Sequence, residues 1–275
     1  MTPAVLLLAL ALFGGPLDDS ALGADLTART VAAWDAFAKA TEERIAREEA
    51  DGRRFLGLDF EPGRDATADR TGLRSGTVVI DQPTTNGAAE AIAVPDGEVH
   101  HWRGVLFLPG VTLDQVLQEL RRPAPVSDDV LASRVLQDTP EGQRVYLKLL
   151  RKKLVTAVYN TEHDVRFVRH SPTRASTRSV SSRIAELEAP GTAQEKEKPV
   201  GHDRGFLWRL NAYSRFEQVA GGVIVEIESI SLSRAVPMLA RPIVGPIVSS
   251  VARESMDRTL ASLRRRLPPG GGPAR

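Results

Sequence analysis

The chain has 275 residues, 42% of them hydrophobic, and a formal net charge of +1 at pH 7. A chain of this length can bury one sizeable core, and we expect one main domain. The near-neutral charge, without a basic stripe interleaved with aromatic residues, excludes a typical nucleic-acid-binding surface. The absence of cysteine excludes disulfides, thiolate metal sites and a cysteine nucleophile.

The N-terminal segment carries an apolar run from Ala4 to Phe13, followed by small residues at Gly23 and Ala24. This run is shorter than the ~20 apolar residues that a helix needs to span a bilayer. We therefore predict a signal peptide over residues 1–24 and an exported protein, periplasmic or secreted. A buried N-terminal helix is the alternative, because no lysine or arginine precedes the run. Whether the signal peptide is cleaved stays open.

Residues 25–72 are predicted to be an N-terminal helix and a connector that precede the main domain at residues 73–268. The helix covers residues 25–50, where apolar side chains recur at helical spacing. Residues 53–71 are rich in Gly, Pro, Asp and Arg, and we assign no secondary structure to them. Residues 269–275 are a predicted disordered tail. The apolar positions of the helix are Val31, Trp34, Phe37 and Ile45.

Seven segments of the main domain have apolar residues at every second position, which is typical of β-strands. Asp-Gly at 96–97 and Gly-Gly at 221–222 lie between neighbouring segments and favour antiparallel hairpins. Residues 189–205 are polar and are predicted to form a loop. The predicted strands cover residues 75–82, 98–108, 143–150, 154–168, 173–188, 205–219 and 221–232.

Two short helices and one long helix are predicted in addition. Thr112 is the expected N-cap of the first short helix, and a second one is expected around residues 127–131. The long terminal helix has one apolar face, with Pro242 and Pro246 at its entry. Its longest uncharged stretch, residues 242–252, is too short to span a membrane, so we predict that this helix closes the core.

This order of elements resembles the START-like helix-grip superfamily, which includes polyketide cyclases, plant pathogenesis-related proteins and lipid-transfer domains. The resemblance covers residues 73–267 and rests on element order, above all on the pairing of residues 206–234 with the terminal helix. It implies an α+β fold in which a curved antiparallel β-sheet wraps around a long C-terminal helix, with the helix at 25–50 as an addition. It also implies a tunnel between sheet and helix that holds an apolar ligand.

Side-chain alternation predicts which residues face that tunnel. The odd positions of 154–168 are expected to face inward. Arg183 lies on a strand of mostly small residues, and either meets a ligand acid group or sits on a solvated edge. Hydroxyls on the terminal helix either meet the ligand or bond back to their own helix. The expected ligand-binding residues are Tyr159, Thr161, His163, Arg183, Trp208, Ala212, Val225, Ser255, Met256 and Thr259.

Catalytic and metal-binding motifs are sparse. His163 and Tyr159 share the inward face and are the best candidates for moving a proton, although both are also compatible with a satisfied core. His100 and His101 are neighbours on a strand and point to opposite faces, and no HExxH motif occurs, so we predict no metal and no cofactor.

The favoured function is binding or transport of a hydrophobic or amphipathic, lipid-like small molecule rather than catalysis. One alternative is a cyclase- or hydratase-type enzyme that uses His163 and Tyr159. Another is a non-catalytic cell-envelope interaction module. The sequence determines neither the identity of the ligand, nor the oligomeric state, nor the role of the helix at 25–50.

Overall fold

The computed structural model describes residues 26–84, 87–152, 156–235 and 241–269, with the side chains of 241–249 and 251 left out of the description. The predicted signal peptide at 1–24 lies outside these ranges, as does the predicted tail beyond residue 269. Export therefore stays a prediction. Within the described ranges, no helix is long and apolar enough to cross a membrane.

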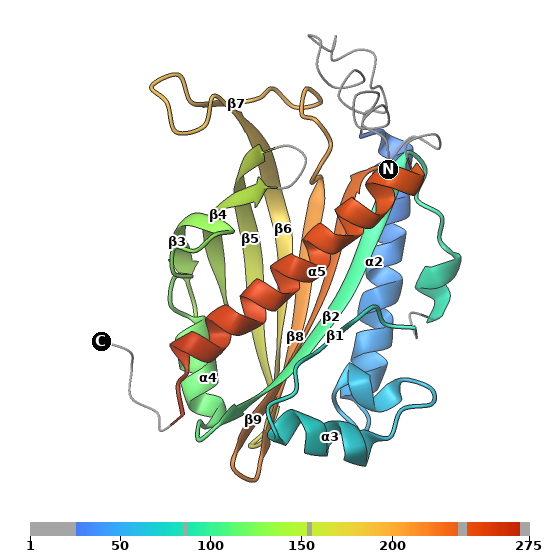
Figure 1. Ribbon diagram of the computed structural model, residues 1–275, viewed down its shortest axis with the longest axis vertical. Helices are drawn as coiled ribbons and strands as arrows, with labels where there is room; N and C mark the ends of the chain where they lie inside the picture. The colour runs from blue at the N-terminus through green and yellow to red at the C-terminus, as the bar shows by residue number, and fades with distance from the viewer. Residues whose placement is uncertain (1–25, 85–86, 153–155, 236–240, 270–275) are drawn as a thin grey trace, which may run out of the picture.

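A curved antiparallel sheet of nine strands forms the body of the protein (Figure 1). The strands follow the order β1-β2-β9-β8-β6-β5-β4-β3, and β7 pairs with β6. Eight of the nine run along the main path, and all pairings among the described strands are antiparallel. Their bounds are β1 Val79–Asp81, β2 Gly97–Pro109, β3 Val130–Asp138, β4 Gly142–Lys152, β5 Thr156–Ser171, β6 Arg174–Glu188, β7 Lys196–Glu197, β8 Arg209–Val219 and β9 Gly222–Arg234.

The long C-terminal helix α5, Arg241–Arg266, crosses the concave face of this sheet (Figure 1). Met256 and Leu260 of the helix share an apolar cluster with Leu106 and Val225 of the sheet. Gly104 of β2 lets the helix approach closely, because a Cβ there would lie 2.7 Å from both the Leu260 Cδ1 and the Met256 Sδ atoms. The predicted arrangement of a curved sheet around a terminal helix is confirmed.

Helix α2, Ala28–Glu49, covers the opposite, convex face of the sheet. Thr27 caps its N-terminus by accepting from the Thr30 amide at 3.1 Å, which satisfies a backbone donor that has no partner inside the helix. Its apolar side chains pack on Tyr213 and Ile230, which alternate with the α5-facing residues of β8 and β9. The additional N-terminal helix is confirmed, and its apolar positions Trp34, Phe37 and Ile45 are buried.

The connector between α2 and the sheet contains structure that the sequence did not predict. It forms a short 3-10 helix, η2 (Gly57–Phe60), and helix α3 (Ala66–Arg74), whose N-cap Asp65 accepts from two amides. Four apolar side chains of this segment pack on the convex face. Charged residues between them interrupt the apolar periodicity, so the sequence pattern did not predict these elements. The four apolar side chains are Phe55, Leu56, Leu58 and Leu73.

Between β2 and β4 one predicted helix is confirmed and one is wrong. Helix α4, Leu113–Leu120, begins after the N-cap Thr112 as expected. Residues 127–131 form no helix, and the chain instead enters the edge strand β3. Two register shifts in β3 interrupt the alternation of its side chains, which is why its pattern was not predicted to be a strand. A further 3-10 helix, η3 (Gly87–Ala91), precedes β2.

Candidate functional site

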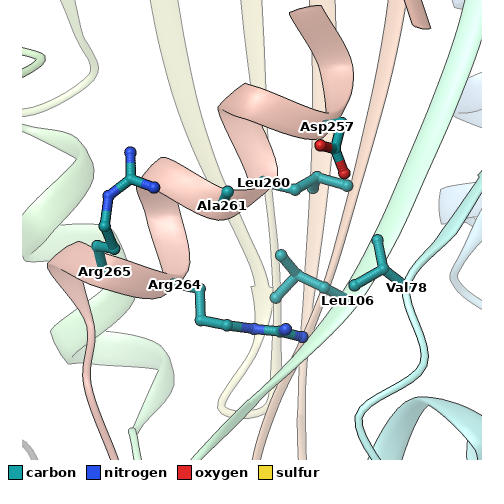
Figure 2. A pocket seen from close by; sticks show the side chains of 7 residues that line it. All are labelled: Val78, Leu106, Asp257, Leu260, Ala261, Arg264 and Arg265. Atoms are coloured by element: carbon teal, nitrogen blue, oxygen red, sulfur yellow. The ribbon is translucent and has the colours of Figure 1, made fainter. Parts of the chain in front are cut away.

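An apolar groove of about 310 Å³ runs between α5 and the β1–β2 edge of the sheet. Figure 2 shows Leu106 and Val78 facing Leu260 of the helix across this groove. The groove thus brings side chains from β2, from the residue before β1 and from α5 into one apolar surface. Its remaining lining residues are Asp257, Ala261, Arg264 and Arg265.

The charged residues of the groove lie at its rim, on α5. Figure 2 shows Arg264 extending along the groove beneath Leu106, whereas Arg265 points away from Leu106 and Val78. Asp257 lies beside Leu260 at the other end. The arrangement can hold an apolar molecule and offers polar partners to a head group at either end.

On the other flank of α5, the concave face carries small side chains on its central strands. Ser179 of β6 is paired with Ala212 of β8, and Ser181 of β6 is paired with His163 of β5. Ser179, Ser181 and Ala212 are only half-buried, although they lie far from the edges of the sheet. This part of the concave face is therefore not filled by close-packed side chains.

Tyr159, Thr161 and His163 all lie on the concave face, as predicted, and all three are buried. The Thr161 hydroxyl donates to the Leu147 carbonyl at 3.1 Å, so it accepts from His163 Nε2, which lies 3.1 Å away. Burial lowers the pKa of His163 to about 4, so this side chain is neutral at pH 7. In this arrangement His163 is a neutral, buried side chain that donates a hydrogen bond to the Thr161 hydroxyl.

Tyr159 is only 1% exposed, and its hydroxyl has no hydrogen-bond partner in the described part of the chain. Burial, reinforced by the Glu186 carboxylate, raises the pKa of the phenol, which keeps its proton. A buried hydroxyl without a partner costs about 1–3 kcal/mol. Tyr159 and His163 are four residues apart on one strand, so their Cα atoms are roughly 13 Å apart and the two groups do not act on one proton.

Of the two alternatives for Arg183, the structure has the solvated position, although β6 is not an edge strand. Glu162 is paired with Arg183, but His163 is paired with Ser181, so Ser182 is an extra residue in β6. Such a bulge shifts the following side chains to the other face. Arg183 therefore lies on the convex face, where it is 43% exposed and forms ion pairs with Glu162 and Glu197.

The expected position of Trp208 was wrong. Trp208 precedes β8 and packs in the α2 cluster on the convex side, with its indole Nε1 donating to Asp203 at 2.9 Å. Thr259 is exposed, and its hydroxyl bonds back to the Ser255 carbonyl at 2.8 Å, which is one of the two alternatives that the sequence left open. Of the remaining expected residues, Val225 and Met256 are buried in the cluster beneath α5, while Ala212 and Ser255 are half-buried. Their role in ligand binding stays a prediction.

None of the seven residues that line the groove was among the expected ligand-binding residues. Arg151 of β4 was missed as well. It follows the inward-facing Leu147 and Leu149 at two-residue spacing, and extending the predicted strand by one residue would have included it. No group of three or more potential metal ligands occurs in the ranges that the structure describes.

The convex face holds a buried cluster of charged side chains between α2, η2 and the sheet. Arg215 of β8 bonds the Glu48 carboxylate at 2.6 Å and the Phe55 carbonyl at 3.0 Å. Glu226 of β9 accepts from the amides of Gly57 and Leu58 at 2.7 and 2.8 Å. These contacts tie the N-terminal segment to the sheet.

Glu228 occupies the centre of that cluster. It pairs with Arg44 of α2 and lies 2.7 Å from His101 Nε2. Burial alone would raise its pKa, but the hydrogen bond with His101 and the charges of His101, Arg44 and Arg215 lower the pKa to about 2. Glu228 is therefore buried and ionised, and its ion pair with Arg44 ties α2 to the sheet.

Similarity to known proteins is confined to three-dimensional structure, since no family model and no curated protein matches the sequence. Human StAR-related lipid transfer protein 5 is 15% identical with a TM-score of 0.43, over 86% of this chain and 97% of that one. A STAR-related lipid transfer protein from Xanthomonas axonopodis is 19% identical with a TM-score of 0.38, over 64% and 95%. The Zhui aromatase/cyclase from a Streptomyces species is 12% identical with a TM-score of 0.38, over 64% and 99%.

The START-like helix-grip fold is defined by this chain's own topology, in which an antiparallel sheet curves around the C-terminal helix. The structural neighbours named above include lipid-transfer proteins and a cyclase. Identities this low concern the arrangement of elements, and one fold hosts many functions. The function of this chain has to be argued from its own surfaces.

Proposed function

We propose that this protein binds a hydrophobic or amphipathic small molecule in the groove between α5 and the β1–β2 edge. The observation that carries the proposal is the apolar lining of this groove, formed by Val78, Leu106, Leu260 and Ala261. Its volume of about 310 Å³ lies at the lower end of the range for small-molecule sites. Transport of the bound molecule, in the manner of a lipid carrier, is part of the proposal.

The groove combines an apolar floor with charged groups at its rim, which suits an amphipathic molecule. An acyl or ring system would contact the half-buried Val78 and Ala261, while a head group would reach Arg264 or Asp257. Burial of apolar ligand surface supplies about 25 cal/mol per Å². A ligand that buries apolar surface in this groove is therefore expected to bind the protein with measurable affinity.

The test is to fill the groove. Ala261→Trp places an indole among the lining residues, and we expect it to abolish binding of the neutral dye Nile red and to remove any lipid retained in native mass spectrometry. Arg253→Trp is the matched control, because Arg253 is exposed on the same helix and is not among the lining residues. Unchanged dye affinity in a folded Ala261→Trp variant would show that the groove is not the binding site.

A further inference from the structure

Two polar side chains lie close to each other on the β4–β5 side of the concave face. One is Tyr159, whose buried hydroxyl has no hydrogen-bond partner within the described residues. The other is the half-buried Arg151 of β4, whose Nη1 donates to the Leu150 carbonyl at 3.1 Å and which forms no ion pair in the part of the chain that the structure describes. Buried hydroxyls in proteins nearly always have a hydrogen-bond partner, so Tyr159 requires an explanation.

The strand register brings Arg151 and Tyr159 together. Arg151 is opposite Ala157, and Leu149 is opposite Tyr159, so Arg151 and Tyr159 are diagonal neighbours on one face of the sheet. Diagonal pairs are within reach of long side chains. A guanidinium and a phenol therefore lie side by side, and both are hydrogen-bond donors.

The carboxylates around this pair are engaged by other groups. Glu186 is paired with Lys198 at 3.1 Å and accepts from Arg204. Asp129 accepts from Arg258 of α5 at 2.7 Å. Asp203, the third neighbouring carboxylate, accepts from the Gly205 amide and the Trp208 indole.

Arg151 is the cation of this group that forms no ion pair among the described residues, since Lys198 and Arg204 pair with Glu186, and Arg258 pairs with Asp129 and Glu254. A single unpaired guanidinium favours a monoanion over a dianion. The side chains around Tyr159 are apolar, which favours an acid with a hydrophobic body. They are Leu149, Ala157, Leu207 and Leu210.

We propose that Arg151 and Tyr159 form a binding site for the carboxylate of a hydrophobic organic acid. The guanidinium matches the planar carboxylate, and the Tyr159 hydroxyl supplies a further donor. The apolar side chains around Tyr159 would contact the body of the acid. This site goes beyond the groove proposed above, because β9, β8 and β6 separate β2 from the β4–β5 pair.

The test uses isothermal titration of the full chain with octanoate, with its neutral counterpart octanol, and with octyl phosphate. We expect saturable binding of octanoate, with octanol and octyl phosphate each weaker by about tenfold or more. Arg151→Met should weaken octanoate by ~10–100-fold and Tyr159→Phe by ~3–10-fold. Neither variant should change the affinity for octanol, because octanol carries no carboxylate.

Arg183→Met is the matched control, because Arg183 lies on the neighbouring strand but on the convex face, paired with Glu162 and Glu197. It should leave octanoate binding unchanged. Tyr159→Phe removes only a hydroxyl without a partner, so the variant should fold as the unmodified chain does. Absence of saturable octanoate binding, equal affinity for octanol, preference for octyl phosphate, or unchanged octanoate affinity in both variants would each overturn the assignment.

Discussion

The concave and convex faces of the sheet are covered in different ways. The concave face meets α5 through apolar side chains such as Leu106. The convex face meets the N-terminal segment through apolar clusters that include Trp34 and Phe55, and also through the buried ion pairs of Arg215 and Glu228. The convex contact therefore combines apolar packing with a buried ionic cluster, whereas the concave contact with α5 is apolar.

Breaking the convex cluster should have the largest effect. Arg215→Ala removes the guanidinium that bonds Glu48 at 2.6 Å and leaves Glu48, Glu226 and Glu228 buried with less positive charge. We expect the free energy of unfolding, measured by urea denaturation, to fall by roughly 3–5 kcal/mol. Arg183→Ala breaks only exposed ion pairs and should cost less than about 1 kcal/mol. Similar small losses for both variants would contradict a stabilising role for the convex cluster.

The two faces should also respond to acid in different pH windows. His163 on the concave face has a pKa of about 4 when folded and 6.5 in the unfolded reference, so the unfolded state binds its proton first as pH falls. Its contribution to stability is complete above pH 6.5 and is lost between pH 6.5 and 4, on the order of 3 kcal/mol in total. Urea unfolding across this window should show the slope, and His163→Gln should flatten it.

Glu228 on the convex face is the comparison for that experiment. Its pKa is lowered from 4.5 to about 2, so its contribution is complete above pH 4.5 and is lost as the pH falls toward 2. Glu228→Gln should therefore remove the loss of stability that this carboxylate causes between pH 4.5 and 2. If His163→Gln leaves the slope between pH 6.5 and 4 as steep as before, the neutral buried state of His163 is wrong.

The smallest effect is expected where α5 touches the sheet at Gly104. Gly104→Ala would place a Cβ 2.7 Å from the Leu260 Cδ1 and Met256 Sδ atoms, and the flexible ends of both side chains would have to move. We expect a loss of about 1–3 kcal/mol in the free energy of unfolding. Gly72→Ala in α3 is the matched control, because its Cβ would meet only Thr77 at 3.6 Å, and it should stabilise by up to ~1 kcal/mol. Loss of stability in both variants would point to a general intolerance of added methyl groups.

Local periodicity in the sequence was sufficient to predict α2, α4, α5 and most of the strands, since side-chain spacing follows backbone geometry. It also predicted that Tyr159, Thr161 and His163 share one face of β5. The segments that it missed are short or interrupted. Those around η2 and α3 have few apolar residues among many charges, and β3 contains two register shifts.

Tertiary structure alone decided which side chains meet. The extra residue Ser182 turned Arg183 to the convex face, and α2 covers charged side chains of β8 and β9 in a buried ionic cluster. Arg44 and Glu228, which form one of its pairs, are 184 positions apart in the chain. The alternation of side chains along a strand depends only on residues that are close in the sequence. The bulge in β6, the covering helix α2 and the proximity of Arg151 to Tyr159 depend on segments that meet only after folding.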